Sequence, residues 1–481
     1  MALFVNRTSE LAFLTQLLTR QKPGPAQLVL LYGRRRVGKT VLLKHWIAQN
    51  PQTTATYWVA EKETAPLQRR KFYARLFNIP FPRAPIFESW AEVWTAVAEL
   101  LQGRRHIVIL DELPYAAEAD PAMLSALQHA WDQHFKDSEV VLVLCGSQVR
   151  IMETLLTRQS PLFGRMTGQW CLEPLEFGAL RAFFPNWSAE ERVAAYAIAG
   201  GIPAYLEWLN PARTLVENIR DVILSPGSMF IAEPQFLLYD EVREPQTYLA
   251  VLKTIGAGYR TLSEISNASL ITKTHLSSYL TTLQELRLVE RRIPVTVAPA
   301  MRRKSRQGRY HLSDPYFRFY FRFLDPYQDV LTLEPERVLD AIRQNLRAFV
   351  GQTAFEELAQ TWLRQKDRAG QLTWTPEAIG SHWSRQVQVD VVAVHWQTRH
   401  LLLGECKWTG APVDEAIVHE LIRDKTPKVL RDLEIAEAGW QIDYAFFSRN
   451  GFTDQAQTAA KQVNSLLVDL PTLDQDLQSK F

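Results

Sequence analysis

Cysteine is scarce in this sequence, which contains three in 481 residues. Cys145, Cys171 and Cys406 each lie in or beside an apolar run, and their spacing matches no metal-binding motif. An odd number of cysteines with irregular spacing argues against a disulfide framework. We interpret the three thiols as small buried side chains in a reducing compartment.

Long apolar runs are missing as well. No run reaches the roughly 20 residues that a membrane-spanning helix needs, and the segment Met1–Arg7 lacks a long apolar core. The net charge is only +2, which excludes a uniformly basic protein and makes any basic surface a local one. We therefore expect a cytoplasmic protein with no membrane partner.

What remains is the composition of a globular protein. Apolar residues make up 47% of the sequence and charged residues 22%, so sizeable cores are available. A chain of this length predicts about three domains.

One stretch matches a phosphate-binding motif at every fixed position. The apolar run Leu28–Tyr32 predicts a buried parallel strand, and the chain from Val41 onward predicts a helix. Strand, glycine loop and helix in this order are the context of a P-loop, whose backbone N–H groups and helix N-terminus bind phosphate. We expect Lys39 to reach the β- and γ-phosphates of ATP and Thr40 to bind Mg²⁺. The motif consists of Gly33, Arg34, Arg35, Arg36, Val37, Gly38, Lys39 and Thr40.

A second buried strand, Ile107–Leu110, is followed by two carboxylates, Asp111 and Glu112. An aspartate at the end of such a strand lies beside the P-loop hydroxyl and can be a Mg²⁺ partner. The glutamate one residue later can act as the general base for the attacking water. The alternative is a solvated acidic turn.

A third strand, Val140–Leu144, ends in a short polar segment that contains Ser147 and Gln148. Either side chain can sense the γ-phosphate of ATP, and the alternative is a plain turn at the end of the strand. A fourth strand is predicted over Gln169–Leu172.

Six motifs in this order and spacing resemble the archaeal-type ATPases, P-loop proteins of the AAA+/STAND kind, over residues 1 to about 240. The motifs are Asn-Arg-x-x-Glu-Leu, Tyr-Gly-Arg-Arg-Arg-Val-Gly-Lys-Thr, Leu-Asp-Glu, Cys-Gly-Ser, Pro-Leu-Phe-Gly-Arg and Gly-Gly-Ile-Pro. The resemblance implies a parallel sheet with helices on both faces and a helical lid that includes residues 201–203. It also implies that Asn6 and Arg7 lie near the adenine. Gln148 stands where relatives commonly have serine.

Arg165 lies in a loop just before the fourth strand. In AAA+ relatives a similar position supplies an arginine finger to the neighbouring subunit of a homo-oligomer, where it stabilises charge on the transferred phosphoryl group. The alternative is a surface arginine, or one that pairs within its own subunit.

Three helices followed by a strand, within residues 244–310, match a winged helix-turn-helix. Such a unit places its third helix, here Thr272–Leu286, in the major groove of DNA, and the helix carries Lys273 and His275. From Arg291 to Tyr310 there are seven Lys or Arg and no acid, which predicts salt-dependent contact with DNA phosphates. The alternative is a unit used for packing or autoinhibition. The densest basic part, the expected wing, contains Arg302, Arg303, Lys304 and Arg306.

An aromatic-rich run follows over Tyr310–Phe323 and includes Arg318 and Arg322. Exposed aromatic side chains could stack on nucleic-acid bases. The preferred interpretation is a core helix whose two arginines, four residues apart, snorkel from one edge.

The last third contains two predicted strands that carry charged side chains. Asp390 lies on the first, Val387–Val394, and precedes Glu405 by fifteen residues, which suits the first strand of a hairpin. Glu405 and Lys407 are two residues apart on the second strand and so point to one face. Two acids on adjacent strands can hold Mg²⁺, and the lysine can position or activate a water that attacks a phosphodiester.

This constellation resembles the PD-(D/E)XK core of restriction-endonuclease-like proteins, with Asp390 followed by Glu405-x-Lys407. The resemblance implies that Glu356, on the preceding predicted helix, is a third acid of the site. Archaeal-type ATPases commonly carry such a domain. Val389 stands where the name of the family expects proline, a place at which relatives vary. The alternative is a degenerate nuclease fold that has lost its chemistry.

Together these features predict an α/β protein: a P-loop sheet with a helical lid, then a winged helix, then a restriction-endonuclease-like domain. We expect an enzyme that hydrolyses ATP with Mg²⁺, acts on DNA and carries a Mg²⁺-dependent nuclease. The expected segments are 1–178 (ATPase domain), 179–243 (lid), 244–310 (winged helix), 311–345 (helical connector) and 346–481 (nuclease-like domain).

Two other functions remain open. One is a STAND-type signalling switch with an inactive nuclease-like domain, and the other is a DNA-binding regulator that uses ATP as a ligand. A basic face around Asp390 would favour DNA cleavage, and an acidic or occluded face would favour the switch. Defence against foreign DNA and DNA repair both fit the sequence.

Overall fold

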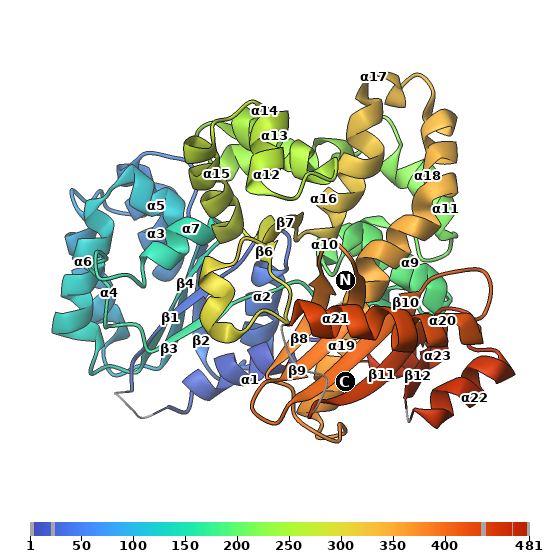
Figure 1. Cartoon of the computed structure of the whole chain (residues 1–481). Helices are drawn as coiled ribbons and strands as arrows, with labels where there is room; N and C mark the ends of the chain where they lie inside the picture. The colour runs from blue at the N-terminus through green and yellow to red at the C-terminus, as the bar shows by residue number, and fades with distance from the viewer. Residues whose placement is uncertain (1–3, 21–24, 434–438, 464, 479–481) are drawn as a thin grey trace. The chain divides into compact units, whose positions relative to one another are not determined.

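The computed structural model describes residues 4–20, 25–433, 439–463 and 465–478. The chain divides into two compact units (Figure 1). The first unit contains residues up to 175 together with 202–204, and the second contains 176–201 and the chain from 205 onward. No helix in these ranges is long and apolar enough to cross a membrane. All three cysteines are free thiols, with Cys145 buried and the other two half-buried.

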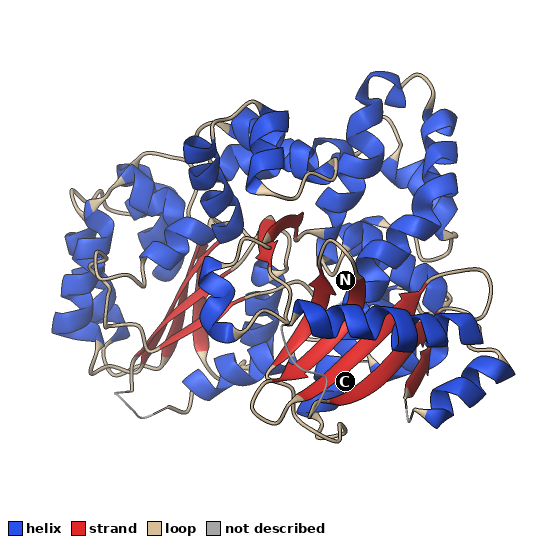
Figure 2. Cartoon of the chain, in the orientation of Figure 1, coloured by secondary structure: helices blue, strands red, loops and turns tan. Residues whose placement is uncertain are grey.

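The first unit is built on a five-stranded, wholly parallel sheet in the order β2-β3-β4-β1-β5 (Figure 2). The three central strands are buried at every position, as their unbroken apolar sequences predict. The strands are β1 (Gln27–Tyr32), β2 (Thr54–Val59), β3 (His106–Asp111), β4 (Val140–Gly146) and β5 (Gly168–Cys171). The helices are α1 (Thr8–Leu17), α2 (Lys39–Gln49), α3 (Ala65–Leu76), α4 (Trp90–Leu101), α5 (Leu113–Ala119), α6 (Ala122–Ala130) and α7 (Val149–Thr154).

Strand β2 is the element of this sheet that the sequence did not predict. It lies at one edge, and only Thr56 and Trp58 of its side chains are buried, so it lacks a continuous apolar run. Its Trp58 ring packs against Phe72 of α3 and Trp90 of α4, with ring centroids 5.2 and 6.2 Å apart. These aromatic contacts anchor the edge strand to the core of the unit.

One part of the second unit consists of three helices and a small antiparallel ribbon. Helices α13 (Pro245–Gly256), α14 (Leu262–Ser269) and α15 (Lys273–Glu285) precede two paired strands, β6 (Val289–Arg292) and β7 (Arg309–Leu312). The three predicted helices are therefore present. The connection between β6 and β7 does not stand free, because Val295 N donates to Ser381 O at 3.1 Å and Trp383 Nε1 donates to Gln307 O at 3.1 Å.

A second five-stranded sheet, in the order β12-β11-β10-β9-β8, forms the C-terminal part of this unit. Strands β8, β9 and β10 pair antiparallel, whereas β10, β11 and β12 pair parallel. Only β9 and β10 were predicted, although β11 contains the buried run Tyr444–Phe447. The strands are β8 (Ala378–Trp383), β9 (Gln388–His395), β10 (His400–Lys407), β11 (Gln441–Ser448) and β12 (Leu466–Asp469).

Helices fill the rest of the second unit, and two predicted boundaries fall inside elements. The boundary at residue 310 cuts β7, and the one at 345 cuts α18, whose apolar stripe continues through Phe349 and Val350. The helices are α8 (Leu180–Phe183), α9 (Ala189–Ala199), α11 (Leu215–Asn218), α12 (Met229–Glu241), α16 (Pro315–Phe319), α17 (Gln328–Leu331), α18 (Pro335–Val350), α19 (Glu356–Arg368), α20 (Glu415–His419), α21 (Thr426–Asp432), α22 (Asp454–Gln462) and α23 (Leu470–Asp476). Helix α10 (Pro203–Trp208) begins in the first unit.

The aromatic-rich run is core, as preferred from the sequence, since Tyr316, Phe317 and Phe319 are all fully buried. A buried ion pair secures another part of the unit. Arg192 on α9 and Asp474 on α23 are 5% and 9% exposed, and their closest atoms are 2.7 Å apart. This pair joins segments that are 282 residues apart in the chain.

Replacing Asp474 by asparagine should strongly destabilise the second unit, because Arg192 would keep its charge without a carboxylate. Loss of one member of a buried pair costs about 3–5 kcal/mol. Urea unfolding, followed by tryptophan fluorescence, measures the loss. The matched control is Asp221→Asn, which breaks solvent-accessible pairs with Arg213 and Arg220 and should change the midpoint little. Equal midpoints for the two variants would contradict this account.

Candidate functional site

The predicted P-loop joins β1 to α2, and its two glycines hold backbone conformations that other residues rarely adopt. Gly33 has φ +155°, and a Cβ there would lie 2.4 Å from Leu172 O. Gly38 has φ +96° and immediately precedes α2. The Lys39 ammonium folds over the loop and donates to the carbonyl oxygens of Gly33 (2.8 Å) and Arg34 (3.1 Å). The loop therefore encloses the lysine that the motif assigns to phosphate.

Asp111 lies at the carboxyl end of β3 and accepts hydrogen bonds from hydroxyl groups of two other elements. Thr40 Oγ1, from the start of α2, donates to Asp111 Oδ2 at 3.1 Å. The Tyr57 hydroxyl, from β2, donates to the same oxygen. Burial, with the Asp111 charge, raises the pKa of Tyr57, so this phenol remains a donor. The sequence analysis missed Tyr57 because β2 itself was not predicted.

Glu112 and Ser147 meet at the ends of β3 and β4. The Glu112 carboxylate accepts hydrogen bonds from Ser147 Oγ (2.8 Å) and Ser147 N (3.1 Å). Glu112 also takes a left-handed conformation, φ +51°, which turns the chain out of the sheet. The candidate sensor Ser147 contacts the candidate base, and the other candidate sensor, Gln148, is buried.

Arg7 is buried, and its side chain contacts the backbone of the P-loop. Its guanidinium donates to Val37 O and Glu173 O, both at 2.9 Å, and pairs with Glu10 at 2.9 Å. Asn6, next to it, has φ +46°. These contacts give Arg7 a structural role next to the loop, in addition to the adenine proximity that the resemblance implies.

Arg165 forms a two-bond ion pair with Asp132 within the same chain. Its Nε and Nη2 atoms donate to the two carboxylate oxygens at 2.9 and 2.6 Å. The side chains of Arg165 and Asp132 are 25% and 43% exposed. This is the internal pairing that the sequence left open beside the trans arginine finger.

The second group of predicted residues meets where β9 and β10 pair. The register places Val391 opposite Gly404, so Asp390 and Glu405 follow next to each other at the end of the ladder. Asp390 Oδ2 accepts a bond from Cys406 N at 3.1 Å. Lys407 Nζ lies 2.7 Å from Glu405 Oε1, which confirms that these two side chains share a face.

Lys425 is part of this cluster and was missed from the sequence. It lies 20 residues after Glu405, with no motif spacing to mark it, and donates to both oxygens of Glu405 at 2.9 and 2.8 Å. Two ammonium groups therefore neutralise the Glu405 carboxylate.

Glu356, at the start of α19, also lies near these acids. Burial, followed by the charges of Asp390 and Glu357, raises the pKa of Glu356 to about 9. Burial, followed by the charge of Glu405, raises the pKa of Asp390 to about 6. Carboxylate oxygens that repel each other in a buried place suit a hard cation such as Mg²⁺. However, no three acidic, histidine or cysteine side chains in the described ranges are grouped closely enough to hold a metal. Glu405, one of the three predicted acids, is instead paired with Lys407 and Lys425.

The predicted DNA-contacting residues divide into two groups. Lys273 and His275 are exposed at the start of α15. Arg303, Lys304 and Arg306 are also exposed. Arg302 is used internally, since its guanidinium donates to Val297 O (3.2 Å) and Val295 O (3.0 Å) and so holds its own loop.

Comparison with known proteins gives two family matches and one extended relative. A model of an ATPase domain found predominantly in Archaea matches residues 4–209, and a model of archaeal and bacterial proteins of unknown function matches residues 320–419. An uncharacterized protein of Methanocaldococcus jannaschii is 32% identical over 409 residues, which cover 84% of this chain and 88% of that protein. An uncharacterized ATP-binding protein of the same organism is 51% identical over 45 residues, 9% of this chain and 71% of that protein.

Two solved structures are similar at lower identity. The Walker-type ATPase of Pyrococcus abyssi has a TM-score of 0.46 and 18% identity, over 66% of this chain and 96% of that one. The ORC2 protein of Aeropyrum pernix has a TM-score of 0.43 and 14% identity, over 72% of this chain and 95% of that one. The ATPase-domain match and the relative aligned along most of both chains establish that this protein belongs to the archaeal-type ATPase family.

Proposed function

We propose that this protein uses ATP binding and hydrolysis to control a Mg²⁺-dependent nuclease that acts on DNA. The single observation that carries the nuclease part is the meeting of Asp390, Glu405 and Lys407 at one end of the β9–β10 ladder. The ATPase part follows from the P-loop and from the family to which the chain belongs.

At the ATP site, each side chain takes a separate role. Lys39 binds the β- and γ-phosphates, and Thr40 and Asp111 would hold the Mg²⁺ that neutralises developing phosphate charge. Glu112 accepts the proton of the attacking water. The two bonds from Ser147 hold the Glu112 carboxylate, and Ser147 is the side chain that would sense the γ-phosphate.

At the carboxylate cluster, Asp390 and Glu405 are the residues that would hold Mg²⁺, with Glu356 as a third donor nearby. The metal would supply a Lewis acid and an activated water. Lys407 is placed to orient that water and to balance negative charge. Although burial lowers the pKa of Lys407, the Glu405 carboxylate more than offsets it, so Lys407 stays charged.

We assign DNA binding to α13–α15 and the β6–β7 ribbon as a winged-helix unit. The exposed Lys273 and His275 on its third helix are suited to phosphate and base contacts. The exposed Arg303, Lys304 and Arg306 lie on a connection that packs on β8 of the C-terminal sheet. DNA held by this unit would therefore lie on the same unit of the protein as the nuclease candidate.

A second function is favoured by the pairing of Glu405 with lysines. Both of its oxygens accept bonds from lysines, and the described acids form no ready metal group. This arrangement suits an ATP-dependent signalling switch that keeps a nuclease-like fold without its chemistry. The two functions differ in one property, which is DNA cleavage by the wild-type protein.

Replacing Glu112 by glutamine should keep ATP binding and slow hydrolysis about 10²–10⁴-fold, the usual contribution of a general base. Lys39→Ala should weaken binding as well. Phosphate release and equilibrium binding of a fluorescent ATP analogue measure the two effects. Glu118→Gln, an exposed acid on α5, is the matched control. Unchanged turnover in Glu112→Gln would remove the assignment of the base.

Replacing Asp390 by asparagine should abolish DNA cleavage and leave ATP hydrolysis unchanged. The assay incubates plasmid and branched DNA with Mg²⁺ or Mn²⁺, with and without ATP. The matched control is Asp424→Asn, an exposed aspartate, which should cleave as the wild type does. If the wild type hydrolyses ATP but cleaves neither substrate, the switch function replaces the nuclease.

Mixing two inactive variants tests the trans finger. If Arg165 acts on a neighbouring subunit, Arg165→Ala and Lys39→Ala should be inactive separately and regain ATP hydrolysis when mixed. Finger removal costs about 10³–10⁵ in turnover. If Arg165 only pairs with Asp132, Arg165→Ala and Asp132→Ala should both hydrolyse ATP normally, and that result would refute the finger.

A further inference from the structure

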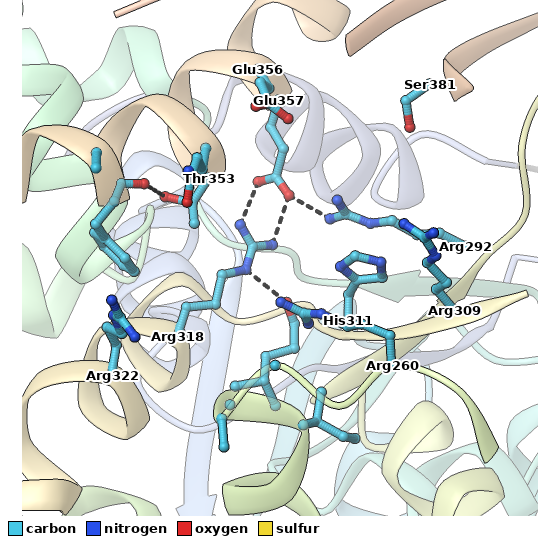
Figure 3. A pocket seen from close by; sticks show the side chains of 18 of the residues that line it. Arg260, Arg292, Arg309, His311, Arg318, Arg322, Thr353, Glu356, Glu357 and Ser381 are labelled. Atoms are coloured by element: carbon cyan, nitrogen blue, oxygen red, sulfur yellow. Dashed lines mark hydrogen bonds and ion pairs between the residues drawn. The ribbon is translucent and has the colours of Figure 1, made fainter. Parts of the chain in front are cut away.

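A cavity of about 590 Å³ lies in the second unit, between the β6–β7 ribbon and helices α18 and α19 (Figure 3). This volume is within the range of small-molecule sites. Five arginines line the cavity against only two carboxylates, Glu356 and Glu357. The arginines come from four separate segments and are Arg260, Arg292, Arg309, Arg318 and Arg322.

Glu357 already satisfies two of the arginines. Arg318 donates to it at 2.8 Å, and Arg292 donates to it as well, as the dashed lines in Figure 3 show. The Glu357 carboxylate is therefore paired with two guanidinium groups. Glu357 is thus an ionised bridge that joins β6 and α16 to α19.

The other three arginines have no such partner. Arg260, Arg309 and Arg322 take part in no ion pair among the residues that the structure describes. The Arg309 guanidinium lies 5.3 Å from the centroid of the Trp383 ring, and the Arg260 guanidinium donates to Tyr310 O at 3.5 Å. The nearby Glu264 accepts backbone bonds from residues 260 and 261 and caps α14.

The field inside the cavity is strongly positive. Burial, followed by three neighbouring arginines, lowers the pKa of Arg260 to about 10. Burial and four neighbouring arginines lower the pKa of His311, on the cavity wall, to about 2, so this ring is neutral. Like charges held together in a partly buried space carry a cost that a bound anion removes.

We propose that this cavity binds a ligand with neighbouring phosphate groups, either a free nucleoside polyphosphate or the 5′-phosphate end of a nucleic-acid strand. Guanidinium groups bind phosphate through two parallel bonds, and three of them are available here without breaking the Glu357 bridge. A single carboxylate ligand would leave most of this positive charge unneutralised. The site does not depend on nuclease activity.

The experiment uses the full chain with Lys39→Ala, so that the P-loop is weakened equally in every sample. Tripolyphosphate, ATP, and oligonucleotides with a 5′-phosphate or a 5′-hydroxyl are titrated by calorimetry. The test variant adds Arg260→Gln, Arg309→Gln and Arg322→Gln. The matched control adds Arg368→Gln, Arg431→Gln and Lys461→Gln, which removes the same charge from exposed positions outside the cavity.

The expected result is at least tenfold weaker binding of tripolyphosphate in the test variant than in the control. The ligand should also raise the melting temperature of the control and not that of the test variant. Binding of ATP would identify a free nucleotide as the source, and preference for the 5′-phosphate oligonucleotide would identify a strand end. Equal affinity of the test and control variants for every probe would overturn the proposal.

A single substitution guards against misfolding of the triple variant. Arg322 is exposed, so Arg322→Gln should fold normally and still weaken tripolyphosphate binding several-fold. Unchanged affinity in Arg322→Gln, together with loss of structure in the triple variant, would also count against the site.

Discussion

Hydrogen bonds to the carboxylate of Asp111 hold together the candidate ATP site of the first unit. This carboxylate accepts hydrogen bonds from the hydroxyl groups of Thr40, after β1, and of Tyr57 on β2. These contacts are possible because all five strands run parallel, so their carboxyl ends share one edge of the sheet. The same edge receives Ser147 from β4, which holds Glu112. The residues that we propose for phosphate, metal, general-base and sensor roles are therefore gathered by strand direction and strand order.

The second sheet gathers its charges by a different constraint. Antiparallel pairing of β9 and β10 fixes Asp390 next to Glu405, and the two-residue period of a strand adds Lys407 on the same face. Lys425 arrives from the following helical segment and completes the neutralisation of Glu405. If the lysines stay bound to Glu405, the cluster is a set of ion pairs. If Glu405 is released from them, the acids can bind a cation.

Contacts within the second unit link the β6–β7 ribbon and its neighbouring helices to this sheet. Arg292 and Arg318 meet on Glu357, the residue that follows Glu356. Thr296 Oγ1 lies 2.7 Å from His382 Nδ1, beside the backbone bond from Val295 to β8. A ligand that engages Arg260, Arg309 and Arg322 would therefore bind beside the ionic bridge that fixes the start of α19. Such a bridge gives the phosphate cavity and the carboxylate cluster a physical connection.

The sequence by itself determined the P-loop, the pair Asp111 and Glu112, the three central strands and the hairpin acids, because each is a local motif within a strong apolar period. It also indicated three helices before β6. Only the tertiary structure decided that Tyr57 reaches Asp111, that Lys425 holds Glu405, and that Arg165 pairs with Asp132. These partners are 20 to 54 residues apart in the chain. Their meeting depends on edge-strand order and helix packing, which leave no periodic pattern in the residues themselves.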